Sequence, residues 1–182
     1  MDQPDPSVGA QTSVWREVLC GLKTLASGGA YALLIVTFVF QVARVDGLSM
    51  EPTLKDHDRL IVNRLTYRWG DPRPGDIVTL YYPRDPTILF VKRVIAGEGD
   101  VVRSEDGTVF VNDVRVDDDY VREEFRSHDD WGPEVVQEGY YLVMGDHRNG
   151  SSDSRAWGQV PKKYIVGRVN ARWWPLWDVR LF

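Results

Sequence analysis

The chain has 182 residues, enough for one globular domain of ordinary size and a short additional segment. Its 43% hydrophobic content argues against disorder, and its formal net charge of −5 gives no support for a nucleic-acid partner, whose phosphates need a basic face. The single cysteine, Cys20, excludes an internal disulfide and a metal site built from several cysteines.

Residues 24–43 are the first recognisable element, a run without charged side chains between Lys23 and Arg44. A helix of this length spans about 30 Å, the thickness of the hydrocarbon core of a bilayer. A buried core helix would normally show a polar face, and a cleaved secretory signal would have a shorter apolar run and a less acidic leader. We therefore predict a transmembrane anchor at 24–43, preceded by an N-terminal tail at 1–23. The flanking charges are too balanced to indicate its orientation.

Residues 44–182 show the pattern of a β-rich domain. Turn-forming Pro, Gly, Asn and Asp separate a series of runs rich in β-branched and aromatic residues: 59–63, 76–82, 88–95, 101–103, 108–111, 113–116, 140–144 and 164–169. No helical period longer than two turns follows the anchor, so we predict a mainly β, barrel-like domain behind a single N-terminal transmembrane helix. The acidic residues 117–138 are expected to form a solvated insertion.

Two segments contain residues that could form a catalytic pair. Ser49 lies at 45–54, directly after the apolar run, and Lys92 lies at 90–100, a strand-like segment that ends in a glycine turn. A serine hydroxyl is a poor nucleophile until a base removes its proton. Lysine can be that base if its pKa falls by about three units from about 10.4, which burial among apolar groups achieves. The apolar neighbours of Lys92 would supply such burial.

Each of these residues also has an ordinary explanation. A lysine on a strand is exposed far more often than catalytic, and Ser49 beside Gly47 and Pro52 could be a turn residue. A Ser-His-Asp triad is an alternative because His147 follows Asp146. A triad is defined by geometry, however, and neighbouring side chains on a strand point in opposite directions, so we disfavour it.

A third segment, 145–158, is dense in short polar residues. Such segments are usually loops whose side chains bond to their own backbone. The segment could instead form a polar network, in which Asp146 and Asp153 pair with Arg148 or Arg155.

Together these segments resemble the sequence boxes of type I signal peptidases. The matching patterns are Ser-Met-x-Pro-Thr-Leu at 49–54, Lys-Arg-Val-Ile-x-Gly-x-Gly-Asp at 92–100 and Gly-Asp-x-Arg-x-x-Ser-x-Asp-Ser-Arg-x-x-Gly at 145–158. Gly-Asp-Ile-Val at 75–78 supplies a fourth box. The order and spacing also match, and the resemblance covers residues 34–170.

The resemblance implies a serine–lysine peptidase. By it, Ser49 is the nucleophile, its backbone amide donates to the oxyanion, and Lys92 is the general base. Ser151 matches the serine that orients the lysine amine, while Asp153 and Arg155 match a supporting ion pair.

Further roles follow from the same resemblance. Arg93 and Asp146 match structural positions, and the shallow pockets for small residues before the cut would be lined by Val45, Met50, Phe90 and Val91. The family cleaves signal peptides of exported preproteins after a small-x-small pattern, on the outer side of the cytoplasmic membrane, and uses no metal or cofactor.

Two departures from the pattern concern the oxyanion and the last box. Gly47 stands where some members carry a serine that donates to the oxyanion. His147 stands where an asparagine is more usual, and the resemblance implies no proton transfer by the residue at this position. The short stretch between Asp100 and Gly145 matches the compact branch of the family.

Two other functions remain open at this stage. One is a membrane-tethered β domain that binds a partner without cleaving it, which the intact Ser49–Lys92 pair disfavours. The other is a self-cleaving serine–lysine protease of the repressor type, which the predicted anchor and the lack of DNA-binding helices disfavour.

The segment 173–177 contains three tryptophans around a proline. These rings could pack in the core. Tryptophan is also enriched at membrane interfaces, so Trp174 or Trp177 could enter the lipid headgroup region.

Overall fold

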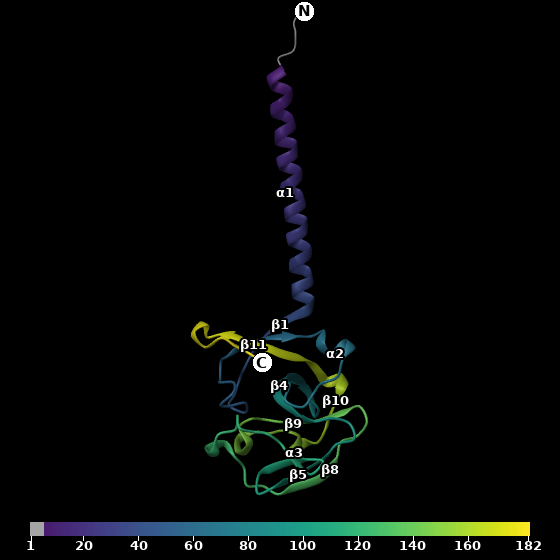
Figure 1. The fold of residues 1–182 in the computed structure, drawn as a ribbon, viewed down its shortest axis with the longest axis vertical. Coiled ribbons are helices and arrows are strands. Elements are labelled where there is room, and N and C mark those ends of the chain that lie inside the picture. The colour runs from purple at the N-terminus through teal and green to yellow at the C-terminus, as the bar shows by residue number, and fades with distance from the viewer. Residues whose placement is uncertain (1–5) are drawn as a thin grey trace, which may run out of the picture. The chain divides into compact units, whose positions relative to one another are not determined.

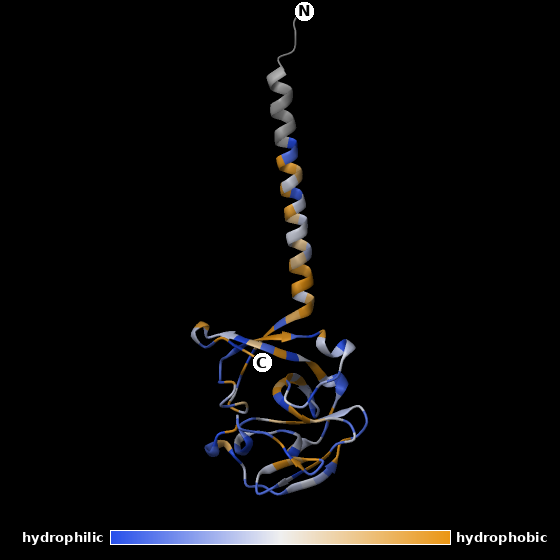
Figure 2. Cartoon of the chain, in the orientation of Figure 1, coloured by the Kyte–Doolittle hydropathy of each residue, from blue (hydrophilic) through white to orange (hydrophobic). Residues whose placement is uncertain are grey.

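The computed structural model describes residues 6–182, with side chains from Arg16 onward (Figure 1). Its first element is a helix, α1, over Pro6–Val39. Within α1, Arg16–Val39 is long and apolar enough to cross a membrane, and its most apolar window is not buried by protein. Hydrophobic residues are concentrated in the half of α1 that leads into β1 (Figure 2). The first five residues of the predicted tail lie outside the described residues.

Helix α1 ends before Ala43, the predicted end of the anchor. Phe40–Arg44 instead forms strand β1, which pairs antiparallel with β2, Arg59–Asn63. Ala43 is 8% exposed and belongs to an apolar cluster of the β-rich unit. The chain divides into two compact units between Val39 and Phe40. We therefore place the end of the proposed anchor at Val39.

The β-rich unit is built on a large antiparallel sheet. Its strand order is β1-β2-β11-β3-β4-β9-β10, and β12 pairs with β11. The remaining strands of this sheet are β3 (Ile77–Tyr82), β4 (Asp85–Ala96), β9 (Tyr140–Met144), β10 (Val160–Pro161), β11 (Ile165–Trp174) and β12 (Arg180–Leu181). Strands distant in the sequence are thus neighbours in space. The predicted mainly β domain is confirmed.

A second, smaller sheet has the strand order β7-β6-β5-β8. Its strands are β5 (Val101–Glu105), β6 (Thr108–Val111), β7 (Val114–Arg115) and β8 (Trp131–Val135). Short helical segments connect the strands: α2 (Thr66–Trp69), α3 (Ser154–Trp157), η1 (Glu123–Phe125), η2 (Arg148–Gly150), η3 (Lys162–Tyr164) and η4 (Leu176–Asp178).

Apolar clusters hold these elements together. One cluster joins the two sheets, because Leu142 from β9 packs with Val102 from β5 and both are fully buried. Another contains Leu54 and Leu60 and lies beneath the segment that carries Ser49. Each such buried side chain stabilises the fold by roughly 1.5–3 kcal/mol relative to exposure. The clusters therefore give the site a rigid base.

Residues 117–130, which we call the acidic strap, differ from the solvated insertion expected from the sequence. Asp118 and Val121 are each 3% exposed, and Ser127 is 7% exposed. The physical reason is that the carboxylate of Asp118 pairs with the guanidinium groups of Arg126 and Arg148. Burial of an acidic residue is tolerated when its charge is paired and hydrogen-bonded.

Candidate active site

Ser49 lies in the segment between β1 and β2. We call residues 45–54 the nucleophile loop. The side chains of Met50 and Leu54 are buried at 1% and 0% exposure, and a backbone hydrogen bond of 2.9 Å runs from the amide of Leu54 to the carbonyl of Met50. Ser49 itself is half-buried. The loop is therefore fixed to the core directly beside the serine.

Lys92 reaches Ser49 from strand β4. It lies opposite Val78 of β3 in the sheet and is 2% exposed. Its Nζ donates a hydrogen bond of 2.6 Å to Oγ of Ser49. The next residue, Arg93, pairs with Asp146 instead, as expected when successive side chains of a strand point to opposite faces. The structure thus brings together the two residues of the predicted dyad.

The amine of Lys92 is a weak base for a lysine. Burial lowers the pKa of Lys92 from its ordinary value of 10.5 to about 8. The carboxylates of Asp153 and Asp146 act in the opposite direction and raise this pKa, while the guanidinium of Arg155 lowers it. About a tenth of such a lysine is neutral at pH 7, far more than for an exposed lysine, and this neutral form can accept a proton.

A cleft of about 260 Å³ opens onto this pair. It contains Ser49 and Lys92 together with the four side chains predicted to form the substrate pockets, namely Val45, Met50, Phe90 and Val91. Nζ of Lys92 also lies 5.3 Å from the centroid of the Phe90 ring. The nucleophile loop and β4 therefore line one cleft, which holds the dyad and these apolar side chains together with the charged Arg44 and Asp46.

Gly47 adopts a backbone conformation that favours glycine. Its φ is 113°, and its amide donates a 2.9 Å hydrogen bond to the carboxylate of Asp56. This hydrogen bond is the main reason that the pKa of Asp56 lies below its ordinary value. A residue with a side chain would be strained here, so a serine at position 47 would not fit this conformation.

Buried ion pairs hold the polar loop, residues 145–155. Arg93 donates to both carboxylate oxygens of Asp146 at 2.9 and 2.7 Å. Arg155 likewise contacts both oxygens of Asp153 at 2.9 and 2.8 Å, and both aspartates are 0% exposed. The predicted pair of Asp153 with Arg155 is therefore present in the structure. Asp146 instead pairs with Arg93, and not with Arg148 or Arg155 as the sequence suggested.

Ser151 lies beside the nucleophile loop. Its Oγ is buried and has no hydrogen-bond partner among residues 6–182. A Cβ at Gly145 would overlap both this hydroxyl and the backbone carbonyl of Ser49, so Gly145 permits their close approach. The hydrogen bond of the Lys92 amine goes to Ser49. Orientation of the lysine by Ser151 remains a prediction.

His147 does not form a triad with Ser49. Its Nδ1 lies 3.2 Å from the carbonyl oxygen of Leu48, and no hydrogen bond to Oγ of Ser49 is found in the described part of the chain. Asp146, the other candidate member, is bound to Arg93. The Ser-His-Asp alternative therefore lacks its required contacts.

The acidic strap supplies contacts that sequence reasoning missed. The hydroxyl of Tyr120 accepts a 3.2 Å hydrogen bond from Arg148, and its ring lies 4.0 Å from the guanidinium carbon of Arg93. The ring of Phe125 lies 4.3 Å from that of His147. One feature of the sequence could have predicted these contacts. The polar loop and β4 contain several arginines, and buried arginines need carboxylate partners from other parts of the chain.

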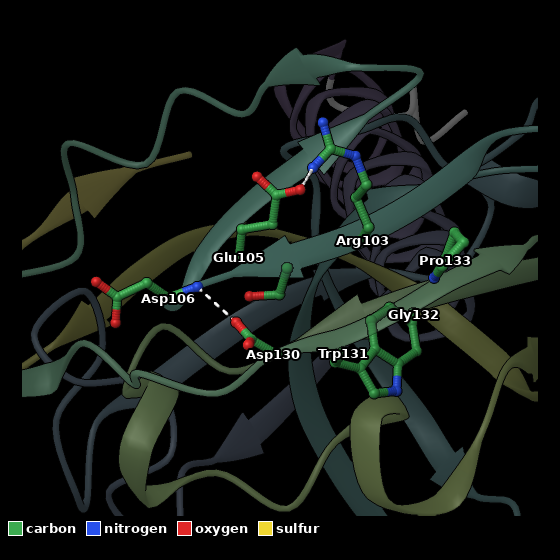
Figure 3. A pocket seen from close by; sticks show the side chains of 8 residues that line it. Arg103, Glu105, Asp106, Asp130, Trp131, Gly132 and Pro133 are labelled. Atoms are coloured by element: carbon green, nitrogen blue, oxygen red, sulfur yellow. Dashed lines mark hydrogen bonds and ion pairs between the residues drawn. The ribbon is translucent and has the colours of Figure 1, made fainter.

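A larger hollow of about 750 Å³ lies on the smaller sheet (Figure 3). Its lining includes Trp131, Arg103 and Asp130, and none of the residues predicted for catalysis. Arg103 pairs there with Glu105, and Asp130 accepts from the amide of Asp106. The charged side chains of Arg103, Glu105 and Asp130 thus already have protein partners.

Asp46, Asp56 and His57 form another cluster, with potential ligand atoms within 4.8 Å of one another. These groups already have protein partners. Arg44 contacts Nδ1 of His57 at 2.7 Å and Asp46 at 3.3 Å, and Asp56 binds the amide of Gly47. A cation would have to compete with the guanidinium of Arg44.

Comparison with known proteins decides the family. The family model described as signal peptidase, peptidase S26, matches residues 20–174. The chain belongs to this family. It is 36% identical to signal peptidase I of Leptolyngbya laminosa, over 95% of this chain and 88% of that protein. It is 39% identical to a probable signal peptidase I-2 of Synechocystis sp. (85% and 72% covered) and 34% identical to signal peptidase I of Bacillus licheniformis (87% and 90%). The members of the peptidase S26 family are peptidases, so this chain is a hydrolase.

Proposed function

We propose that this enzyme removes signal peptides from exported preproteins, with Ser49 as nucleophile and Lys92 as general base. The observation that carries this assignment is the 2.6 Å contact between Nζ of Lys92 and Oγ of Ser49 at the floor of a cleft. Nucleophile and base within hydrogen-bond distance are the geometric requirement for this chemistry. The buried amine has the lowered pKa that a base working near neutral pH needs.

Acylation and deacylation use the same lysine. Oγ of Ser49 adds to the carbonyl carbon of the scissile bond while its proton passes to the neutral Lys92 amine. The carbonyl oxygen becomes an oxyanion that the amide of Ser49 stabilises. Collapse breaks the C–N bond, and Lys92 returns the proton to the departing amine. Water then attacks the ester, gives its proton to Lys92 and restores the serine hydroxyl. These steps need no metal or cofactor.

The residues around the dyad are assigned supporting roles. The Asp153–Arg155 and Arg93–Asp146 pairs hold the polar loop against β4, because each carboxylate is buried and bound through both oxygens. Ser151 is assigned to orient the amine of Lys92, and its buried hydroxyl has a free hydrogen-bonding capacity for that purpose.

The substrate is assigned as a small-x-small segment preceding the cut. Val45, Met50, Phe90 and Val91 share one cleft with the dyad. The cleft has a volume of about 260 Å³, which accommodates short side chains. Contact with these four apolar side chains favours alanine-like groups over charged ones.

The site of action is assigned to the outer face of the cytoplasmic membrane. Helix α1 would be a single-pass anchor, and the lipid bilayer would be a second partner besides the preprotein. Trp177 is 84% exposed and Trp174 is 38% exposed, which suits rings that enter the headgroup region. Signal peptides carry their own apolar segment, so cleavage beside the bilayer matches the substrate.

Cleavage of a preprotein by the full-length protein in detergent tests this proposal. We expect the wild type to release a mature protein whose N-terminus follows a small-x-small motif, and Ser49→Ala to release none. Binding of the preprotein by both proteins without cleavage would support the tethered binding module instead. Shortening of the enzyme itself, with an intact preprotein, would support a self-cleaving protease.

A further inference from the structure

The oxyanion donor of this enzyme is a single peptide group. Gly47 has no side chain to offer, and its amide is used by the carboxylate of Asp56. The amide of Ser49 has no hydrogen-bond acceptor in the described residues and is free to bind the oxyanion. Its N–H belongs to the peptide unit that also contains the carbonyl of Leu48. The direction of this one peptide plane therefore controls the stabilisation of the transition state.

Planarity couples the two ends of this unit. In a trans peptide the C=O and the following N–H are fixed in one plane and point in opposite directions. A donor that binds the carbonyl of Leu48 therefore fixes the direction of the N–H of Ser49. Hydrogen bonding at the carbonyl also polarises the peptide and strengthens its N–H as a donor.

His147 binds the carbonyls on both sides of this N–H. Its Nδ1 lies 3.2 Å from the carbonyl oxygen of Leu48, which can only accept, so Nδ1 carries the proton. Its backbone amide donates a 3.1 Å hydrogen bond to the carbonyl oxygen of Ser49. The amide of Glu51 provides a second donor to Leu48 at 3.0 Å. The peptide planes before and after the nucleophile are thus both tied to His147.

The imidazole of His147 is itself held in place. The ring of Phe125, from the acidic strap, lies 4.3 Å from it at an interplanar angle of 53°. A Cβ at Gly150 would collide with the imidazole, so the absence of a side chain there makes room for the ring. The amide of Gly150 also donates to the carbonyl of His147 at 3.0 Å. The strap therefore supports the nucleophile loop through His147.

We infer that His147 is a positioning residue that orients the Leu48–Ser49 peptide as the oxyanion donor. Among the described residues it makes no hydrogen bond to the hydroxyl of Ser49, so we assign it no proton transfer in the reaction. The neutral ring with its proton on Nδ1 and the doubly protonated ring both donate to Leu48, so the function does not depend on the charge of His147. This inference rests on the proposed role of Ser49 as nucleophile.

Steady-state cleavage of a peptide with a small-x-small site provides the first test. We expect His147→Ala to lower kcat about tenfold, less than the 10²–10³ that loss of a whole oxyanion donor costs, because Glu51 still holds Leu48. KM should change little, since the ground state gains nothing from the oxyanion donor. His147→Asn should recover most of the rate, because its Nδ2 lies near the position of Nδ1. His128→Ala, an exposed histidine on the strap, is the matched control and should be unchanged.

A peptide aldehyde with the same small-x-small sequence provides the second test. Oγ of Ser49 adds to the aldehyde carbon, the C=O π bond opens to an oxyanion, and the serine proton passes to Lys92. The adduct mimics the transition state, so its dissociation constant should rise by the same factor as kcat/KM falls in His147→Ala. A residue that only stabilises the fold would lower Tm without this correlation.

Three results would overturn the inference. The first is an unchanged kcat in His147→Ala. The second is a loss of about 10⁴ or more with a changed pH profile, which would indicate proton transfer by His147. The third is a loss of kcat in both His147→Asn and Phe125→Ala that equals the loss in His147→Ala. This result would indicate that the imidazole acts through packing alone. Ser49→Ala separates the two proposals: if it still cleaves, the proposed function fails, and if it is inactive while His147→Ala is normal, only the inference fails.

Discussion

The pKa of Lys92 is set by two opposing effects, burial of the amine and the charge of nearby carboxylates. A proton acceptor must be neutral, which requires burial, yet two nearby carboxylates stabilise its charged form. Burial has the largest effect, and the pKa of Lys92 is lowered to about 8 while Asp153 and Asp146 raise it. Arg155, the partner of Asp153, acts against the two carboxylates and lowers the pKa of Lys92. The ion pairs of the polar loop thus tune the base as well as the fold.

The pH dependence of cleavage follows from this pKa. Below about 8 the amine of Lys92 is an ammonium and cannot accept the proton of Ser49, and above it the amine is neutral. We expect kcat/KM to rise with pH through an apparent pKa near 8, by about tenfold per pH unit on the acidic side. Initial rates between pH 5.5 and 10 would show this. A rise centred near pH 10 would mean that the lysine is solvated.

The burial of Lys92 should also make the stability of the fold rise with pH. In the unfolded chain Lys92 keeps its ordinary pKa of 10.5, so between about 8 and 10.5 the unfolded state binds more protons and the folded state becomes more stable as pH rises. The gap between these pKa values corresponds to roughly 3 kcal/mol. The stability of Lys92→Met relative to the wild type should therefore fall by up to this amount between pH 7 and 10. Denaturant unfolding at each pH measures it, and a pH-independent difference would contradict the burial.

The sequence predicted the partners of residues that lie in specific motifs, but it did not predict contacts that depend on loop conformation. Ser49 and Lys92 lie in specific patterns, and the structure brings them within hydrogen-bond distance. The contact of His147 with Leu48 joins residues that are distant in the sequence, and it depends on the conformation of two loops. The position of His147 next to Asp146 in the sequence suggested only a Ser-His-Asp triad. The contact with Leu48 could not be predicted, because it joins residues that are far apart in the chain.

At the scale of elements, the acidic strap and the polar loop depend on each other. Arg148 is 3% exposed and donates to the carbonyl of Gly145 at 3.1 Å and to the strap through Asp118 and Tyr120. Arg155 reaches the strap at Ser127, at 3.2 Å. The strap thus supplies counter-charge and hydrogen bonds to a loop that carries site residues. Composition alone indicated a solvated segment, because acidic residues are usually exposed and their partners lie elsewhere in the chain.

Removal of one strap carboxylate tests this dependence. Asp118→Ala leaves the buried guanidinium of Arg148 without its carboxylate, so we expect the free energy of unfolding to fall by about 3–5 kcal/mol. Cleavage should fall with it, because the polar loop loses its support. Asp119→Ala is the matched control, since this neighbour is exposed and should stay within about 0.5 kcal/mol of the wild type. Equal effects of the two changes would show that the strap is only a surface segment.

At the scale of the whole molecule, composition and length predicted the long apolar N-terminal helix, but strand pairing determines where that helix ends. The apolar run continues to Ala43, whereas the helix stops at Val39 because Phe40–Arg44 finds hydrogen-bond partners in β2. Hydropathy alone cannot detect this change, since an apolar strand and an apolar helix have the same composition. The order of the strands also depends on long-range pairing, so the sequence predicted a β-rich domain without its topology.

The exposed tryptophans of the β-rich unit test its proposed contact with lipid. In vesicles that contain the full chain, we expect lipid-attached quenchers to reduce tryptophan fluorescence, and Trp174→Ala with Trp177→Ala to remove a measurable part of that quenching. Trp131→Phe, in strand β8 of the smaller sheet, is the comparison and should not alter it. Quenching that is the same in all three proteins would assign these rings to packing or solvent.

Substitution of Lys92 by arginine shows whether this lysine is the base that removes the proton of Ser49. Lys92→Arg keeps the positive charge and the long side chain, but a guanidinium is not deprotonated in the pH range of the enzyme. We expect this variant to fold, as judged by its circular dichroism and Tm, and to release no detectable mature protein from a preprotein between pH 6 and 10. Measurable cleavage by the folded Lys92→Arg variant would show that another group removes the proton of Ser49.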